Sequence, residues 1–109
     1  MAVAAAALVR VRQGLADGRA RPSEADRDLA ALGARLAAAE PATSAALADE
    51  VARQVGWAPA AARARFLRRD RIAHELTSGA VVGVDSWMLA RSEAAVAAYL
   101  HRAGRHGAR

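Results

Sequence analysis

The sequence predicts an all-α fold, a small bundle of four to five short helices with one irregular extended crossing near residues 80–86. Alanine, the strongest helix former, accounts for 33 of the 109 residues. Most of the larger apolar residues recur every three or four positions, which is the spacing of one helix face. Only one β-branched run lies between glycines, and the length suits a single domain, 1–109.

The first two helices are predicted from alanine content and from a leucine pattern. Residues 2–17 favour helix, and Gly18 is a suitable stop. A second helix begins with a capping-box-like Ser23 and ends at the pair Glu40–Pro41, because proline restricts the residue before it. Its apolar face recurs at i, i+3 and i+7 and consists of Leu29, Leu32 and Leu36.

A third helix is expected between a cap at Thr43 or Ser44 and a stop at Gly56. Its apolar face consists of Leu47, Val51 and Val55. Trp57 occupies the short turn that follows and is expected to lean towards the core. Helix resumes at Pro59, which fits a first helical position.

This fourth helix is expected to continue to Ser78–Gly79, with Phe66, Ile72 and Leu76 as its apolar residues. Three valines between glycines then disfavour helix, so residues 80–86 are predicted to be extended or to form a tight loop. The last helix begins at Ser92 and ends at Gly104. Residues 105–109 are expected to form a frayed tail.

The apolar core is expected to be thin. Only 26 residues are Leu, Val, Ile, Met, Phe, Trp or Tyr. Each such side chain contributes roughly 1.5–3 kcal/mol when buried, and the ordering of the backbone opposes that gain. A chain of this kind is expected to dock on something larger. Residues 51–109 hold ten arginines against four acidic residues, so an acidic partner would meet this half.

The residue inventory argues against several kinds of chemistry. There is no cysteine, no apolar run of the ~18 residues that a membrane span needs, and no basic segment before the short apolar start to suggest a signal peptide. His74–Glu75 lacks a second histidine at zinc spacing, and no pair of carboxylates suggests acid–base catalysis. We therefore expect neither a metal site nor an enzyme acting alone.

One surviving hypothesis is a DNA-binding helix-turn-helix over residues 47–69, with a basic helix at 59–71. Two short helices around Gly56 give its outline. The arginines offered to nucleic acid are Arg63, Arg65, Arg68 and Arg69. A merely solvated basic face explains the same residues, and an alanine- and arginine-rich chain meets this outline by chance.

The second hypothesis comes from the stretch VVGVDSWMLARSEA, residues 81–94. It resembles a segment of the small accessory subunits of flavin-dependent gluconate or sugar dehydrogenases, a family often exported by the twin-arginine route. That segment has an aliphatic run, then Asp-Gly-Trp, a variable residue, Leu-Ser, a variable residue and Thr-Glu-Ala at a helix start. The matching residues are Val81, Val82, Val84, Asp85, Trp87, Leu89, Glu93 and Ala94. Ser86, Ala90 and Ser92 depart from it.

The resemblance implies a non-catalytic small subunit that holds no cofactor of its own. It would bind a large FAD-dependent oxidoreductase subunit, which it stabilises or helps to export or mature. The implied partner interface consists of Val81, Val82, Val84, Asp85, Trp87, Leu89 and Glu93. Whether Trp87 and Leu89 fill this chain's own core or contact the partner stays open. The family is extracytoplasmic, but the expected export signal is missing here, so the compartment stays open too. DNA binding through 59–71 is the alternative function.

Overall fold

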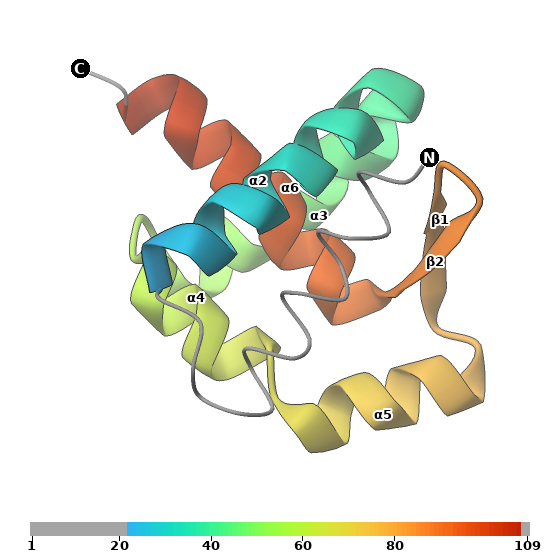
Figure 1. Ribbon diagram of the computed structural model, residues 1–109. Helices are drawn as coiled ribbons and strands as arrows, with labels where there is room; N and C mark the ends of the chain where they lie inside the picture. The colour runs from blue at the N-terminus through green and yellow to red at the C-terminus, as the bar shows by residue number, and fades with distance from the viewer. Residues whose placement is uncertain (1–21, 108–109) are drawn as a thin grey trace.

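The computed structural model describes residues 22–107, so the predicted helix over 2–17 lies outside the described residues. The elements in chain order are α2 Pro22–Ala39, α3 Pro41–Val55, α4 Pro59–Phe66, α5 Arg69–Ser78, β1 Val81–Val84, β2 Trp87–Ala90 and α6 Arg91–Gly107. Helix α6 runs through the middle of the molecule between α2 and α3, while α5 and the β1–β2 hairpin lie beside its beginning and α4 lies farther along it (Figure 1). The predicted all-α class, a small helical bundle, is confirmed.

The centre of α6 is enclosed on every side. Residues 92–100 are all buried, and alanine occupies positions 94, 95, 97 and 98. Short side chains let the neighbouring helices approach closely, most of all where Gly33 of α2 meets the backbone of Ala97. A methyl group at Gly33 would overlap the Ala97 carbonyl, so only glycine fits this crossing.

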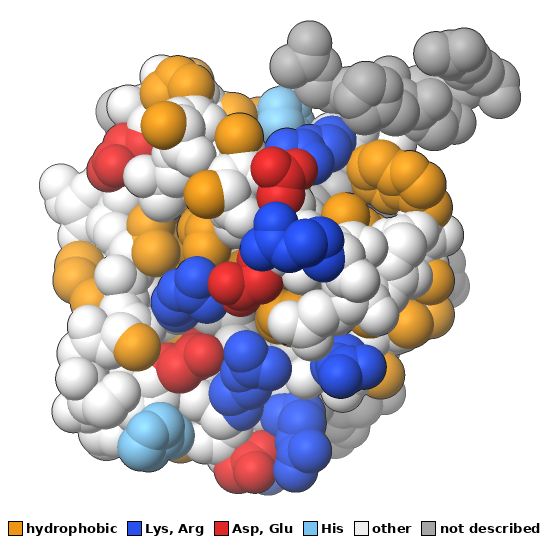
Figure 2. All heavy atoms as spheres, turned by 180° about the vertical axis from the view of Figure 1, so that it is seen from behind, with side chains coloured by type: hydrophobic (Ala, Val, Ile, Leu, Met, Phe, Trp, Pro, Cys, Tyr) orange, Lys and Arg blue, Asp and Glu red, His pale blue; other side chains and the backbone are white. Residues whose placement is uncertain are grey.

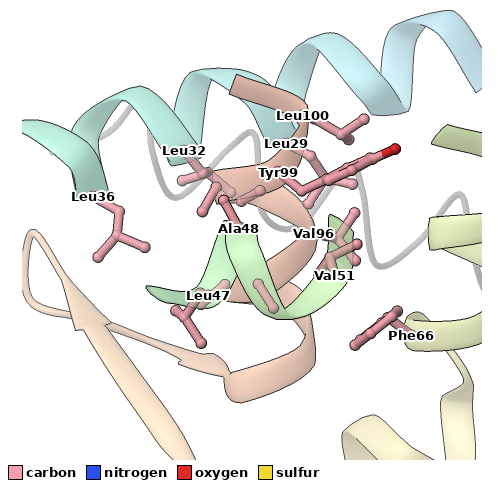
Figure 3. Close-up of a cluster of buried hydrophobic side chains, with 14 of the residues drawn as sticks. Leu29, Leu32, Leu36, Leu47, Ala48, Val51, Phe66, Val96, Tyr99 and Leu100 are labelled. Atoms are coloured by element: carbon pink, nitrogen blue, oxygen red, sulfur yellow. The ribbon is translucent and has the colours of Figure 1, made fainter. Parts of the chain in front are cut away.

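The predicted leucine face of α2 lies in the core. Figure 3 shows its leucines pointing towards α6, with side chains of α3 and α4 on the other side. The largest buried apolar side chains include Leu29, Leu32, Leu36, Val51, Phe66, Leu89, Val96 and Tyr99. Sequence periodicity therefore identified most of the core, because these positions recur on one face of each helix.

Tyr99 fixes the loop between α3 and α4. Its hydroxyl accepts a hydrogen bond from the N–H of Ala58 at 2.7 Å and donates one to the carbonyl of Gly56 at 2.8 Å. Burial raises the pKa of the Tyr99 hydroxyl. Trp57 stacks on the Tyr99 ring with centroids 5.5 Å apart and remains 59% exposed. The expected core position of Trp57 is thus wrong, because Tyr99 occupies the interior and Trp57 covers its outer face.

The expected helix over 59–78 is in fact two helices separated by Leu67 and Arg68. A straight helix of that length would measure about 30 Å, close to the 33 Å longest extent of the molecule. The break instead lets Phe66 enter the core from one direction and Glu75 approach α6 from another. The stops at Gly56 and Gly79 are confirmed.

Two other boundaries differ from expectation. Helix α3 begins at Pro41, so neither Thr43 nor Ser44 is its cap, and Ser44 is buried one turn inside the helix. Proline is well suited to this first turn because it lacks an N–H that would go unpaired. Helix α6 continues past Gly104 to Gly107, since Gly104 has open space around it and no strained backbone. The expected frayed tail is therefore wrong for residues 105–107, and residues 108–109 lie outside the described residues.

Two glycine substitutions should have opposite effects on stability. Gly33→Ala should lower the free energy of unfolding by roughly 1–3 kcal/mol, because the new methyl forces α2 and α6 apart. Gly104→Ala, in an open position of a helix, should raise it by up to about 1 kcal/mol. Urea unfolding followed by circular dichroism measures both. An unchanged midpoint for Gly33→Ala would contradict the close crossing.

Candidate nucleic-acid interface and the exposed hairpin

Helix α5 begins directly after a sharp break in the chain. Leu67 leaves the helical region with φ −95° and ψ 52°, and Arg68 is extended with φ −87° and ψ 135°. As a result α4 and α5 run in different directions (Figure 1). Helix α5 ends at Gly79, whose φ of 83° is left-handed and favours glycine. The break and this stop place α5 along one edge of the molecule.

The inner face of α5 is attached to the start of α6 by the buried carboxylate of Glu75. One carboxylate oxygen accepts a hydrogen bond from the N–H of Ser92 at 2.8 Å, and the other accepts one from the Ser92 hydroxyl at 2.7 Å. Arg71 also donates to Glu75 at 3.4 Å, and its guanidinium lies 4.9 Å from the centre of the Phe66 ring. Negative charge at a helix N-terminus is favourable, so Glu75 holds α5 while stabilising α6.

The outer face of α5 is exposed and polar. It carries Arg69, Asp70, Ala73, His74 and Thr77, which recur at i, i+1, i+4, i+5 and i+8 and therefore share one side of the helix. The backbone N–H of Arg71, followed by the Arg68 side chain, lowers the pKa of Asp70. Both side chains of the Arg68–Asp70 pair are largely exposed, at a distance of 3.3 Å. This pair is consequently open to exchange with another anion.

The four arginines of the DNA hypothesis fall into two groups. Arg65, Arg68 and Arg69 are exposed around the break between α4 and α5. Arg63 instead contacts Asp26 of α2 at 2.9 Å, in an ion pair that lacks good hydrogen-bond geometry. Burial raises the pKa of Asp26, although the Arg63 charge opposes that rise. Arg63 therefore joins α4 to α2 and does not belong to the exposed group.

Basic side chains form a band over the rear face that runs from its upper part to its lower edge (Figure 2). Acidic side chains lie among them. Arginines of this protein also form ion pairs within the molecule, such as the bidentate pair between Arg91 and Glu50, with distances of 2.7 and 2.8 Å. The hydrogen bond from Arg91 lowers the pKa of Glu50. Part of the positive charge of residues 51–109 is thus balanced by an acidic residue from the first half of the chain.

The predicted irregular crossing is an ordered antiparallel hairpin, and its second strand was not expected. Val84 pairs with Trp87, and the two residues between them, Asp85 and Ser86, have φ of 49° and 70°. Two left-handed residues in succession are the geometry of a type I′ turn. Asp85 also contacts Arg35 of α2 at 3.1 Å. The ion pair holds the turn against α2.

The structure separates the seven residues of the implied partner interface. Val84, Leu89 and Glu93 are buried within this chain, and the Glu93 carboxylate accepts a hydrogen bond from the N–H of Ala90 at 2.9 Å. Val81 and Val82 are partly buried, and Asp85 is engaged with Arg35. Exposed apolar surface is left at Trp87, which is 37% exposed, and at Met88, which is 54% exposed.

Sequence reasoning missed Met88 and Glu75. Residues of a strand alternate between two faces, so a strand at 87–90 places Met88 opposite to the buried Leu89. Recognising that strand would have identified Met88. No local signal marks Glu75, because its partner Ser92 lies beyond the hairpin.

Within residues 22–107, no group of acidic, histidine or cysteine side chains is arranged to hold a metal ion. None of the helices in that range combines the length and apolar character needed to cross a membrane. Comparison of the chain with protein families, with curated proteins and with solved structures finds no match. The functional interpretation therefore depends on the residues themselves.

Replacing Glu75 with alanine should destabilise the fold. Two donors of Ser92 would lose their acceptor in a buried position, at a cost of roughly 1–3 kcal/mol in the free energy of unfolding. His74→Ala, on the exposed face of the same helix, should change it by less than about 0.5 kcal/mol. Chemical denaturation of the two variants provides the comparison. Equal midpoints would show that the Glu75–Ser92 contact contributes little.

Proposed function

We propose that this chain binds double-stranded DNA through α4, the break at Leu67–Arg68 and α5. The observation that carries the proposal is the exposed outer face of α5. This helix follows α4 after a change of direction over only two residues, Leu67 and Arg68. In a helix-turn-helix the second helix enters the major groove while the first crosses the backbone. The break is shorter than the three or four residues common in such turns.

This assignment moves the recognition helix along the chain from the one expected at 59–71. Helix α4 has eight residues, of which Ala62 and Phe66 are buried and Arg63 contacts Asp26. Its exposed residues are one proline, three alanines and one arginine, which offer few hydrogen-bonding groups to a groove. Helix α5 contacts the rest of the protein through one face only and is the better candidate.

The exposed residues divide into two kinds of contact. Arg65, Arg68 and Arg69 are suited to phosphates, because arginine donates to phosphate oxygens in a planar fork. His74 and Thr77 lie on the outer face of α5 and are suited to base edges in the major groove. Residues 80–90 contain no arginine or lysine, so the hairpin is expected to contribute little to phosphate binding.

The DNA proposal is tested by fluorescence anisotropy with a labelled duplex of mixed sequence. Three phosphate contacts predict a fall in affinity of about 40-fold between about 50 and 200 mM salt. Arg68→Ala and Arg69→Ala should each weaken binding and lower the salt slope by about 1. Arg27→Ala removes an exposed arginine of α2 and serves as the control. Affinity that is independent of salt, or reduced equally by all three variants, would contradict this interface.

A second candidate function is that of an accessory subunit bound to a large FAD-dependent oxidoreductase. The exposed Trp87 and Met88, within the stretch that resembles that family, favour it. Purification of the tagged chain from its native host should then yield a large partner with flavin absorbance bands. Trp87→Ala should reduce the yield of that partner, whereas Trp57→Ala, at the other exposed tryptophan, should not. A colourless eluate containing nucleic acid would support the DNA proposal instead.

A further inference from the structure

A cavity of about 430 Å³ lies between the end of α2, the beginning of α3 and the second half of α6. Its apolar wall is formed by small residues, including Ala37, Pro41, Ala48 and Ala98. Short side chains leave this space open where three helices meet. The volume lies towards the lower end of the range for small-molecule sites, so an occupant would be small.

The cavity is lined by a hydroxyl group that forms no hydrogen bond with the described residues. Ser44 lines the cavity and is only 6% exposed, yet its side chain forms no hydrogen bond within residues 22–107. The hydroxyl oxygen is accessible from the cavity, so it can form a hydrogen bond with a ligand there. The His101 imidazole, from the facing helix, also lines the cavity and also forms no side-chain hydrogen bond within that range.

The charges around the cavity favour an anion. Arg102 lies at its edge, where its guanidinium contacts Asp49 and donates to the carbonyl of Ala45 at 3.2 Å. None of the lining residues is acidic. The nearby Glu40 is exposed and accepts a hydrogen bond from the Thr43 hydroxyl at 3.2 Å.

We propose that this cavity binds a small aliphatic carboxylate. The carboxylate would accept hydrogen bonds from the Ser44 hydroxyl and from the imidazole of His101. The aliphatic part would contact Ala37, Ala48 and Ala98. A short linear monocarboxylate fits within the cavity and matches the division of its wall into donors and methyl groups. This proposal does not depend on the DNA interface, because none of the residues involved belongs to α4 or α5.

The test is a titration of the full chain with sodium butyrate, followed by NMR of the backbone amides. Saturable shifts should centre on the beginning of α3 and the second half of α6. Butyramide, which is neutral and nearly the same shape, should bind at least tenfold more weakly. Ser44→Ala and His101→Gln should each weaken butyrate binding several-fold, whereas His74→Gln, at an exposed histidine of α5, should leave it unchanged.

A second variant makes the result independent of the polar substitutions. Ala37→Leu fills the cavity from its partly exposed wall and should abolish binding while the circular dichroism spectrum is retained. Three outcomes would overturn the proposal: no saturation with butyrate, equal affinity for butyramide, or unchanged butyrate affinity in a folded Ala37→Leu variant. Each of these is distinguishable from a failure to bind DNA, which is measured with a duplex and with α5 variants.

Discussion

The enclosure of α6 is the constraint on which the rest of the structure depends. A helix surrounded by neighbours on every side can carry only small residues where those neighbours are closest, and this explains the alanines between Glu93 and Tyr99. Alanine buries little apolar surface, so larger side chains must come from the surrounding helices. The leucines of α2, with Val51 and Phe66, supply that surface. The alanines at positions 94, 95, 97 and 98 are thus a packing requirement of the central helix.

Contacts at the two ends of this enclosed segment organise the surface. Near its beginning, Ser92 donates two hydrogen bonds to the Glu75 carboxylate and thereby positions α5. Near its end, the Tyr99 hydroxyl fixes Gly56 and Ala58 and thereby positions α4. Both attachments use inward-facing groups. The outer face of α5 is left unconstrained by packing, and a surface of that kind is free to be shaped by function rather than stability.

Periodicity predicted the helical class, the leucine face of α2 and the stops at Gly56 and Gly79, because each depends on nearby residues. The break at Leu67–Arg68 was not predictable in this way, since it serves contacts of Phe66 and Glu75 with distant parts of the chain. The Arg63–Asp26 contact was not predictable for the same reason. Arg63 was expected to be offered to nucleic acid, but it forms an ion pair with a residue of α2, which is distant in the sequence. A turn without glycine at Asp85–Ser86 likewise concealed the hairpin. Patterns of nearby residues therefore predicted the positions of the helices better than they predicted which side chains remain exposed and unpaired at the surface.

The position of α6 in the chain has a consequence for biosynthesis. Helix α6 contacts every other described element, and the ribosome makes it after all of them. Until Tyr99 and Leu100 emerge, the leucines of α2 have no central helix to cover them. The nascent chain therefore spends most of its translation with an incomplete core, a period in which exposed apolar surface favours aggregation or chaperone binding. Slow translation through the codons of α6 would prolong that period, so the speed of synthesis there bears on the yield of folded protein.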